Sequence, residues 1–368
     1  MNRLLELSLA NRLVVIVLAV LLILAGVSAF RALPIDAFPD VTNIQVTIIS
    51  QAPTLSPLEI EQLVTYPIER ASAGIPHSTE VRSLSKFGLS MVTVVFEDGT
   101  DIYFARQLVL ERMLGARDEL PEGVESSLGP ISTGLGEVFQ YTLESPERSL
   151  MELRTLQDWV LRPILQTVPG TAGVDSFGGE VRQFQIVAEP AALRRYGLAV
   201  DELAEAVADN NGVAGGAYVE RAGEQFVVRG DGWVRDIEDL RETVVAYRDR
   251  VPIRLRDVAT VEIGSEIRQG AITRNGEGET VAGIVLMLRG ASGREVVAGI
   301  KEKLEVAKQS LPDDVEIVPF YDRSELVTTA LGTVKKALIQ GASLVLLVLL
   351  FFMGSPRSAL LVALQLPM

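Results

Sequence analysis

Two long runs without a charged residue constrain this 368-residue chain more than any other feature. The first covers Leu13–Phe30 and as a helix would span roughly 27 Å, at about 1.5 Å per residue. The second covers Ala337–Met353, and a third apolar run begins at Ser358. Because the hydrocarbon core of a bilayer has a comparable thickness, the pattern predicts a membrane protein whose apolar helices flank a long segment of soluble type.

The first run has an alternative interpretation as a secretory signal sequence, because Arg3 and Arg12 precede it. Its apolar stretch is longer than a typical signal core, and no small-x-small cleavage site stands before Arg31. A retained helix is therefore favoured. We expect residues 1–12 to be a cytoplasmic N-terminus and residues 13–30 to form a transmembrane helix.

Both short flanks of the apolar runs carry arginine, which by the positive-inside rule places them in the cytoplasm. Arg31 and two lysines stand on the other side and weaken this argument. Two spans with both flanks inside place residues 31–336 outside, in the periplasm of a Gram-negative cell. A helix over 324–353 is expected to run unbroken into the second span, and 358–368 to start a truncated third one.

The middle segment is strongly acidic. The whole chain has a formal charge of −14, and each end (1–30 and 337–368) contributes +1, so residues 31–336 carry −16. Nucleic acid is an unfavourable partner for such a segment and cations are favourable ones, although solubility alone is the simpler explanation. The absence of cysteine excludes disulfides, thiolate metal sites and cysteine nucleophiles.

The first half of the middle segment reads as an α+β unit. Alternating apolar residues predict strands, and the capping box Ser56-Pro57-Leu58-Glu59 predicts a helix start. The element order β-α-β-β-α-β is that of the ferredoxin-like split pattern. The expected elements are strand 43–50, helix 57–73, strands 80–85 and 90–97, helix 101–120 and a strand near 128–132.

The same order then restarts and is interrupted. A second unit is expected over 137–182 and 273–323, with a helix whose sheet-facing residues are Leu153, Leu156, Val160, Ile164 and Val168. Its strands are expected at 138–143, 174–177, 281–288 and 315–320, and its second helix at 293–310. The insert, 183–272, is predicted to be a separate β-rich domain with a helix near 201–208 and a glycine-rich hairpin from Val213 to Gly232.

Six sequence blocks, taken in order, resemble the heavy-metal efflux branch of the resistance-nodulation-division permeases, which includes cobalt-zinc-cadmium and copper-silver types. The resemblance covers the whole chain, and several blocks are specific to the metal branch. The blocks are 31–41 (RALPIDAFPDV), 87–90 with 94–103, 128–137 (LGPISTGLGE), 176–179, 273–278 and 318–323 (VPFYDR).

The resemblance implies two ferredoxin-like porter subdomains, 33–136 and 137–182 with 273–323, and a docking subdomain at 183–272. It also implies a homotrimer in the bacterial inner membrane that exports divalent heavy-metal cations by proton antiport. Its expected partners are a periplasmic adaptor, an outer-membrane channel and membrane lipid. No cofactor is implied, because the metal ion is the transported substrate. The chain would be the N-terminal part of such a permease, without the later helices that move protons in this family.

Glu137 opens the first strand of the second unit and Asp175 lies in its second strand. Carboxylates are hard ligands that suit divalent ions such as zinc or cobalt. In the family this unit lines the substrate cleft, so both residues are candidate metal-handling groups. The alternatives are strand-end acids that face solvent, or a Glu137 bonded to the backbone of the turn Gly134-Leu135-Gly136.

Other residues point to chemistry more weakly. His77 is the single histidine and lies in a loop, where a solvated side chain is the expected state. Gly212–Gly216 lacks the spacing of a phosphate-binding loop and reads as a flexible arm between protomers. The internal methionines are scattered, which slightly disfavours copper(I). These methionines are Met91, Met113, Met151 and Met287.

Nothing in the sequence calls for enzymatic chemistry, since no histidine-based triad or hydrolytic carboxylate pair is recognisable. Two other functions remain open. A multidrug pump of the same superfamily would line its cleft with aromatic residues, which make up only 6% of this chain. A membrane-anchored scaffold or adaptor would not need the apolar run that starts at Ser358.

Overall fold

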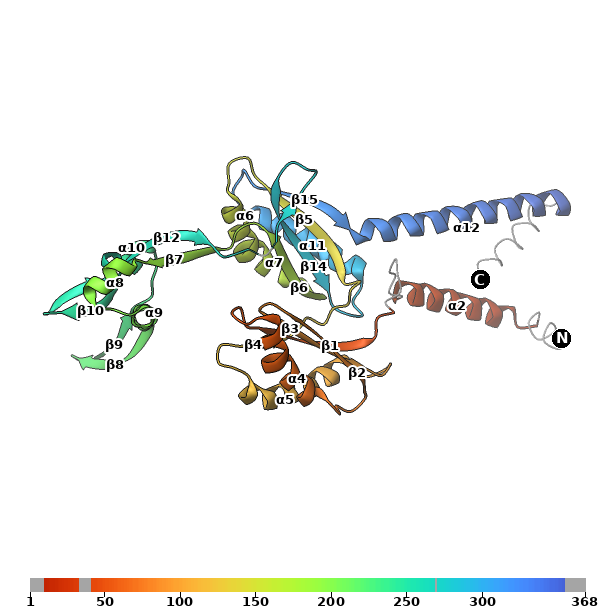
Figure 1. The fold of residues 1–368 in the computed structure, drawn as a ribbon. Coiled ribbons are helices and arrows are strands. Elements are labelled where there is room, and N and C mark those ends of the chain that lie inside the picture. The colour runs from red at the N-terminus through yellow and green to blue at the C-terminus, as the bar shows by residue number, and fades with distance from the viewer. Residues whose placement is uncertain (1–9, 33–40, 269, 355–368) are drawn as a thin grey trace.

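The computed structural model describes residues 10–32, 41–268 and 270–354 (Figure 1). Two units of sheet and helix lie at the centre, an extended insert projects from one of them, and two long helices project from the opposite side. The expectations that fall outside the described residues are those on residues 1–9, 33–40 and 355–368, the third span included.

The first unit is a four-stranded antiparallel sheet in the order β2-β3-β1-β4, and its elements follow the predicted order along the chain. Its helices pack on one face, where Ile60, Val64 and Val109 meet Ile48 and Val94 of the strands. The elements are β1 (Ile44–Gln51), α3 (Pro57–Ile60), α4 (Tyr66–Ser72), β2 (Ser78–Lys86), β3 (Leu89–Phe96), α5 (Ile102–Ala116) and β4 (Glu125–Leu128).

The last strand of this unit lies earlier than predicted. It was expected near 128–132, but β4 pairs with β1 from Gln51 opposite Glu125 to Ile48 opposite Leu128. The amide of Gly129 still donates to the Thr47 carbonyl at 2.8 Å. Pro130 has no N–H to continue the ladder, so the strand ends there.

The second unit repeats this topology. Its sheet has the order β6-β14-β5-β15, with the short β13 also paired along β14, and every pairing is antiparallel. The elements are β5 (Glu137–Glu144), α6 (Leu150–Leu156), α7 (Arg162–Gln166), β6 (Thr171–Gly178), β13 (Ile272–Thr273), β14 (Glu279–Met287), α11 (Gly293–Lys308) and β15 (Glu316–Asp322).

A π-helical turn interrupts the first helix of each unit. Residues 61–65 form this turn between α3 and α4, and residues 157–161 form it between α6 and α7. Proline occupies the second position of the helix that follows in both cases, at Pro67 and Pro163. The two units therefore share a local irregularity as well as a sheet order.

The second π-turn corrects the predicted sheet-facing residues. Leu153 and Val168 are buried as expected, but Leu156, Val160 and Ile164 are only partly buried. A π-turn inserts one extra residue, so the face that meets the sheet moves by one position. The fully buried side chains are the next ones along the chain: Gln157, Leu161 and Leu165.

The insert has its own hydrophobic core, in which Leu203, Leu240, Leu255, Val258 and Val261 are buried. Its described residues form three short α-helices where the sequence indicated one helix. Its hairpin β8–β9 lies where predicted. The elements are β7 (Arg182–Ala188), α8 (Pro190–Tyr196), α9 (Val200–Asp209), β8 (Val213–Arg221), β9 (Glu224–Asp231), α10 (Ile237–Glu242), β10 (Val244–Arg248), β11 (Val251–Arg254) and β12 (Ala259–Ser265).

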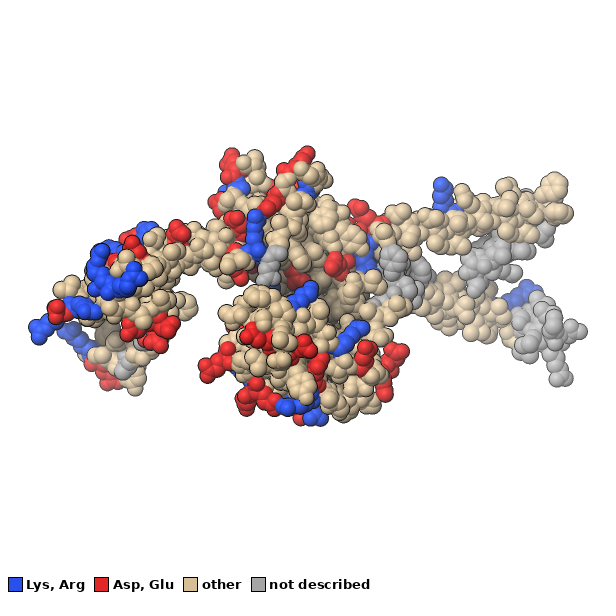
Figure 2. Space-filling model, in the orientation of Figure 1, with Lys and Arg blue, Asp and Glu red and all other residues tan. Residues whose placement is uncertain are grey.

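The two projecting helices are α2 (Arg12–Ala32) and α12 (Arg323–Met353). α12 starts directly after β15, as predicted, and is the one helix among the described residues that is long and apolar enough to cross a membrane. α2 contains a shorter apolar stretch, Arg12–Gly26, so the first span stays a prediction. Charged side chains cover the units and the insert but are sparse on both helices (Figure 2).

Candidate metal-handling site

A β-bulge determines where Glu137 points. Leu286 of β14 pairs with Glu137, but the preceding Val285 pairs with Phe139, so β5 carries one extra residue, Val138. Val138 and Phe139 are both fully buried in the core of the second unit. Glu137 is exposed and lies on the open face of the sheet, the face opposite the helices.

Gln140 is the partner of Glu137 on this face. Its amide nitrogen Nε2 donates to the Glu137 carboxylate oxygen Oε2 at 2.6 Å. In a regular strand, residues three apart point to opposite faces, and the bulge removes this conflict. The Glu137 carboxylate therefore bonds to a side chain, whereas the alternative interpretation expected a bond to the backbone of the preceding turn.

The sheet register places Asp175 on the same open face. Ile284 of β14 pairs with Asp175 of β6 on one side and with Gln140 of β5 on the other. Directly paired residues point to the same face of a sheet. Asp175 is exposed, while its neighbour Val174 is buried in the core.

The two carboxylates share a surface without meeting. Two strand spacings separate Asp175 from Gln140, roughly 10 Å at about 4.8 Å per strand. Among the described residues, no group of three or more His, Asp or Glu side chains lies close enough to hold a metal ion. The arrangement can present two oxygen ligands and an amide oxygen to a passing cation, but it does not form a closed metal centre.

The loop before Glu137 is closely packed. The Gly136 carbonyl accepts from the Met287 amide at 2.7 Å, and the Ile131 carbonyl accepts from the Arg289 amide at 3.1 Å. A Cβ on Gly136 would come too close to the Ser132 hydroxyl and to backbone oxygens. The carboxylate of Glu137 therefore projects from a loop whose backbone position is fixed on several sides.

The remaining sequence candidates lie elsewhere. His77 adopts a left-handed backbone with φ of 63°, and its Nδ1 lies 3.2 Å from the Glu97 Oε2 on the exposed surface of the first unit. Met287 packs in the core of the second unit, whereas Met113 packs against the core of the first. None of these three residues belongs to the open face described above.

The sequence pattern did not indicate Gln140 as a neighbour of Glu137, for a physical reason. Gln140 stands three residues after Glu137, and this spacing predicts that the two side chains lie on opposite faces of the strand. The strand β5 contains no glycine or proline that would indicate a bulge. The signal available in the sequence was the run Val138-Phe139, two adjacent apolar residues where strict alternation expects one.

A family model described as AcrB/AcrD/AcrF matches residues 4–368. The chain belongs to this family. The match includes both units, the insert and both projecting helices, so the family accounts for the whole described architecture.

Individual relatives of this permease chain are proteins named for metal efflux. This chain is 46% identical over 352 residues to the cation efflux system protein CzcA of Alcaligenes sp. strain CT14, and the match covers 93% of this chain and 33% of that protein. It is 40% identical over 364 residues to the cation efflux system protein CusA of Escherichia coli K12, covering 98% and 35%. The resemblance to the heavy-metal branch is thus confirmed.

A solved structure shows the same fold. The crystal structure of a heavy metal efflux pump (crystal form II) superposes with a TM-score of 0.91 at 37% identity, covering 99% of this permease chain and 36% of that chain. The chain therefore spans about a third of the length of the relatives that it matches.

Proposed function

We propose that this chain belongs to a permease that exports divalent heavy-metal cations by proton antiport, and that Glu137 and Asp175 handle the cation on its way out. The observation that supports the proposal most is their common face: the bulge in β5 and the register through Ile284 place both carboxylates on the open side of one sheet. Oxygen ligands of this kind suit zinc and cobalt better than copper(I).

The assignment of roles to the units follows the same reasoning. Residues 33–136, and 137–182 with 273–323, act as two ferredoxin-like porter subdomains, which is supported by their common sheet order. Residues 183–272 act as the docking subdomain, which is supported by their separate core. The intact permease works in the bacterial inner membrane as a homotrimer with a periplasmic adaptor and an outer-membrane channel.

The relatives support a metal cation as the substrate rather than a drug, because CzcA and CusA are both named as cation efflux proteins. The exposed carboxylates supply the matching chemistry. Aromatic residues do stand on the same face, because Tyr321 pairs with Gln140 and the exposed Phe177 lies two residues beyond Asp175 on β6. The metal assignment therefore rests on the relatives and on the carboxylates.

The test is a growth assay on a metal-sensitive host that expresses the permease from its complete gene. We expect Glu137→Gln combined with Asp175→Asn to lower the tolerated zinc or cobalt concentration to near that of the empty vector. The matched control is Glu125→Gln with Asp209→Asn, two exposed acids outside this face. Full resistance of the first double variant at normal expression would remove both residues from the metal path.

A further inference from the structure

The junction between β15 and α12 lies beside the loop that carries Glu137. Asp322 is both the last residue of β15 and the N-cap of α12, so no linker separates the sheet from the long apolar helix. In the sheet, Asp322 pairs with Phe139 and Tyr321 pairs with Gln140. The start of α12 and the start of β5 therefore meet at one corner of the second unit.

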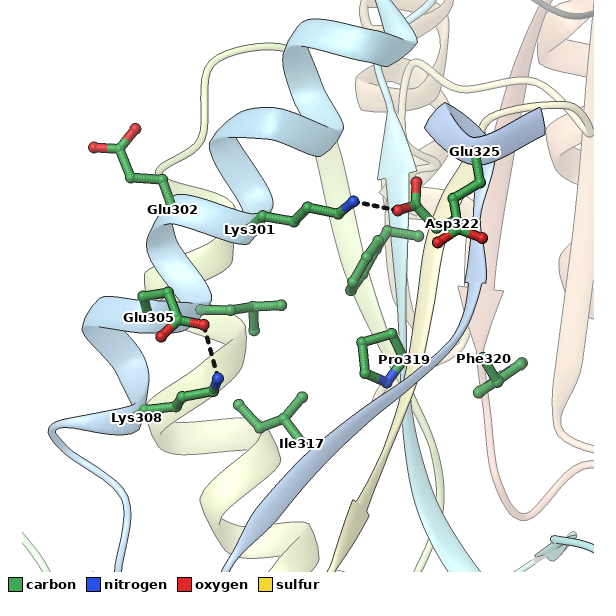
Figure 3. A pocket seen from close by; sticks show the side chains of 11 residues that line it. Lys301, Glu302, Glu305, Lys308, Ile317, Pro319, Phe320, Asp322 and Glu325 are labelled. Carbon is green, nitrogen blue, oxygen red and sulfur yellow. Dashed lines mark hydrogen bonds and ion pairs between the residues drawn. The ribbon is translucent and has the colours of Figure 1, made fainter. Parts of the chain in front are cut away.

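Asp322 is fixed from the α11 side. Its carboxylate accepts from the Ser324 amide at 2.8 Å and from the Ser324 hydroxyl at 2.6 Å, and it forms an ion pair with Lys301 at 2.5 Å. Figure 3 shows Lys301 reaching from α11 across the edge of a cavity toward Asp322, with Glu325 of the first turn of α12 alongside. The cavity has a volume of about 610 Å³, which leaves open space beneath the junction.

Arg323 fixes the junction from the other side. It is the first residue of α12 and is only 4% exposed, although it carries a charge. Its guanidinium donates a hydrogen bond to the backbone carbonyl of Leu135, two residues before Glu137. Burying an arginine side chain costs free energy unless its N–H groups are hydrogen-bonded. Loss of the bond to Leu135 would therefore be unfavourable, and we expect the bond to be kept when α12 shifts.

We propose that Arg323 is a positioning residue that ties α12 to the loop 133–136, so that a displacement of α12 moves the Glu137 carboxylate. Arg323 is covalently part of α12, and its guanidinium is hydrogen-bonded to the Leu135 carbonyl. Leu135 is joined to Glu137 through the backbone of Gly136. The Met287 amide on the Gly136 carbonyl sets the opposite side of the loop. Arg323 acts through Leu135 and does not itself contact the cation. This inference rests on the proposed role of Glu137.

The experiment measures zinc transport into inverted membrane vesicles that contain the intact permease, as a function of zinc concentration. The variants are Arg323→Gln, Glu137→Gln and their combination, with Arg82→Gln as a control. Arg82 lies in the first unit, where its guanidinium bonds the Gln45 side chain on an exposed surface. Expression in the membrane is matched by immunoblot, so that a merely unstable variant is recognised.

We expect Arg323→Gln to raise the half-saturating zinc concentration by about tenfold, the scale of one lost hydrogen bond to a buried charged group. The double variant should be no worse than Glu137→Gln alone, because both changes act on the same carboxylate. Arg82→Gln should transport as the unchanged protein does. If Arg323→Gln fails to reach the membrane, the same comparison uses Arg323→Lys, which keeps a buried cation.

Two results separate this inference from the proposed function. If Glu137→Gln impairs transport while the Arg323 variants match Arg82→Gln, or if the Arg323 and Glu137 effects multiply, the coupling is overturned and the metal role of Glu137 stands. If Glu137→Gln itself transports normally, the proposed function fails, and the positioning role of Arg323 fails with it.

Discussion

Gly283 and Tyr141 lie directly against one another in the second unit, where a Cβ on Gly283 would overlap the Tyr141 ring. The two residues are paired across β14 and β5, and the Tyr141 ring is fully buried over the Gly283 Cα. The Tyr141 hydroxyl donates to the Gln157 side-chain carbonyl at 2.9 Å, and burial raises the pKa of this tyrosine well above its ordinary value. Gln157 in turn belongs to the π-turn, so a glycine in the sheet and an irregular helix depend on the same aromatic ring.

Gly283→Ala should therefore destabilise the second unit by about 1–3 kcal/mol, because the new methyl group would overlap the Tyr141 ring in a filled core. Gly173→Ala on the neighbouring strand β6 is the matched control, since a Cβ there meets nothing within 4 Å. Thermal unfolding of the purified permease, followed by tryptophan fluorescence, makes the comparison. Equal melting temperatures for the two variants would contradict the packing described here.

At the scale of elements, the sequence predicted the order of strands and helices well because apolar periodicity and capping boxes are local signals. The boxes at Ser56 and Ser149 form as expected, each with the glutamate three residues later. The sequence could not show the π-turn after α6 or the bulge in β5, because both depend on how the helix and strand fit the rest of the sheet. The open-face neighbour Gln140 was missed for this reason, while Glu137 and Asp175 were located on the correct strands.

One consequence for elements concerns the cap of α6. Ser149→Ala should destabilise the second unit by about 1 kcal/mol, the usual cost of losing an N-cap hydroxyl. Here the Ser149 Oγ accepts from the Glu152 amide at 3.3 Å, and the Glu152 carboxylate accepts from the Ser149 amide at 2.9 Å. Ser149→Thr, which keeps the hydroxyl, should melt close to the unchanged protein. A Thr variant as unstable as the Ala variant would show that the hydroxyl is not what matters.

The junction of β15 and α12 should also respond to acid. Burial alone raises the pKa of Asp322, but hydrogen bonds from Lys301 and Ser324 outweigh it and hold the pKa below its ordinary value of 3.8. Because the pKa of Asp322 is lower in the folded state than in the unfolded state, ionised Asp322 stabilises the fold at pH values above 3.8. This stabilisation is lost as the pH falls through the folded-state pKa. Melting temperatures between about pH 5 and pH 3 should therefore fall less steeply for Asp322→Asn than for the unchanged protein. Parallel curves would contradict the assignment.

At the scale of the whole molecule, the two projecting helices leave the same side of the folded units, and the insert lies at the far end (Figure 1). The projecting helices carry few charged side chains, which suits an apolar environment, while the units and the insert carry many, which suits an aqueous one (Figure 2). This arrangement supports the proposed placement of the units and the insert on a single side of the membrane.

Residues 1–368 contain no cysteine, so a single introduced cysteine is the one thiol in this part of the protein and can test the placement. A cysteine at Tyr247, which is 70% exposed in the insert, should react with a membrane-impermeant maleimide in intact spheroplasts. A cysteine at Asn11, at the proposed cytoplasmic end of α2, should react only after lysis. Labelling at both positions before lysis would contradict the proposed topology. Labelling at position 11 alone before lysis would show that the topology is inverted.

In the proposed function, carboxylates on the open face of the second sheet serve the export of a divalent cation. The most direct measurement is zinc accumulation in inverted vesicles that contain the intact permease and an imposed proton gradient. We expect accumulation that a protonophore abolishes and that Glu137→Gln with Asp175→Asn reduces to the level of empty vesicles. Accumulation that persists unchanged in this double variant would contradict it.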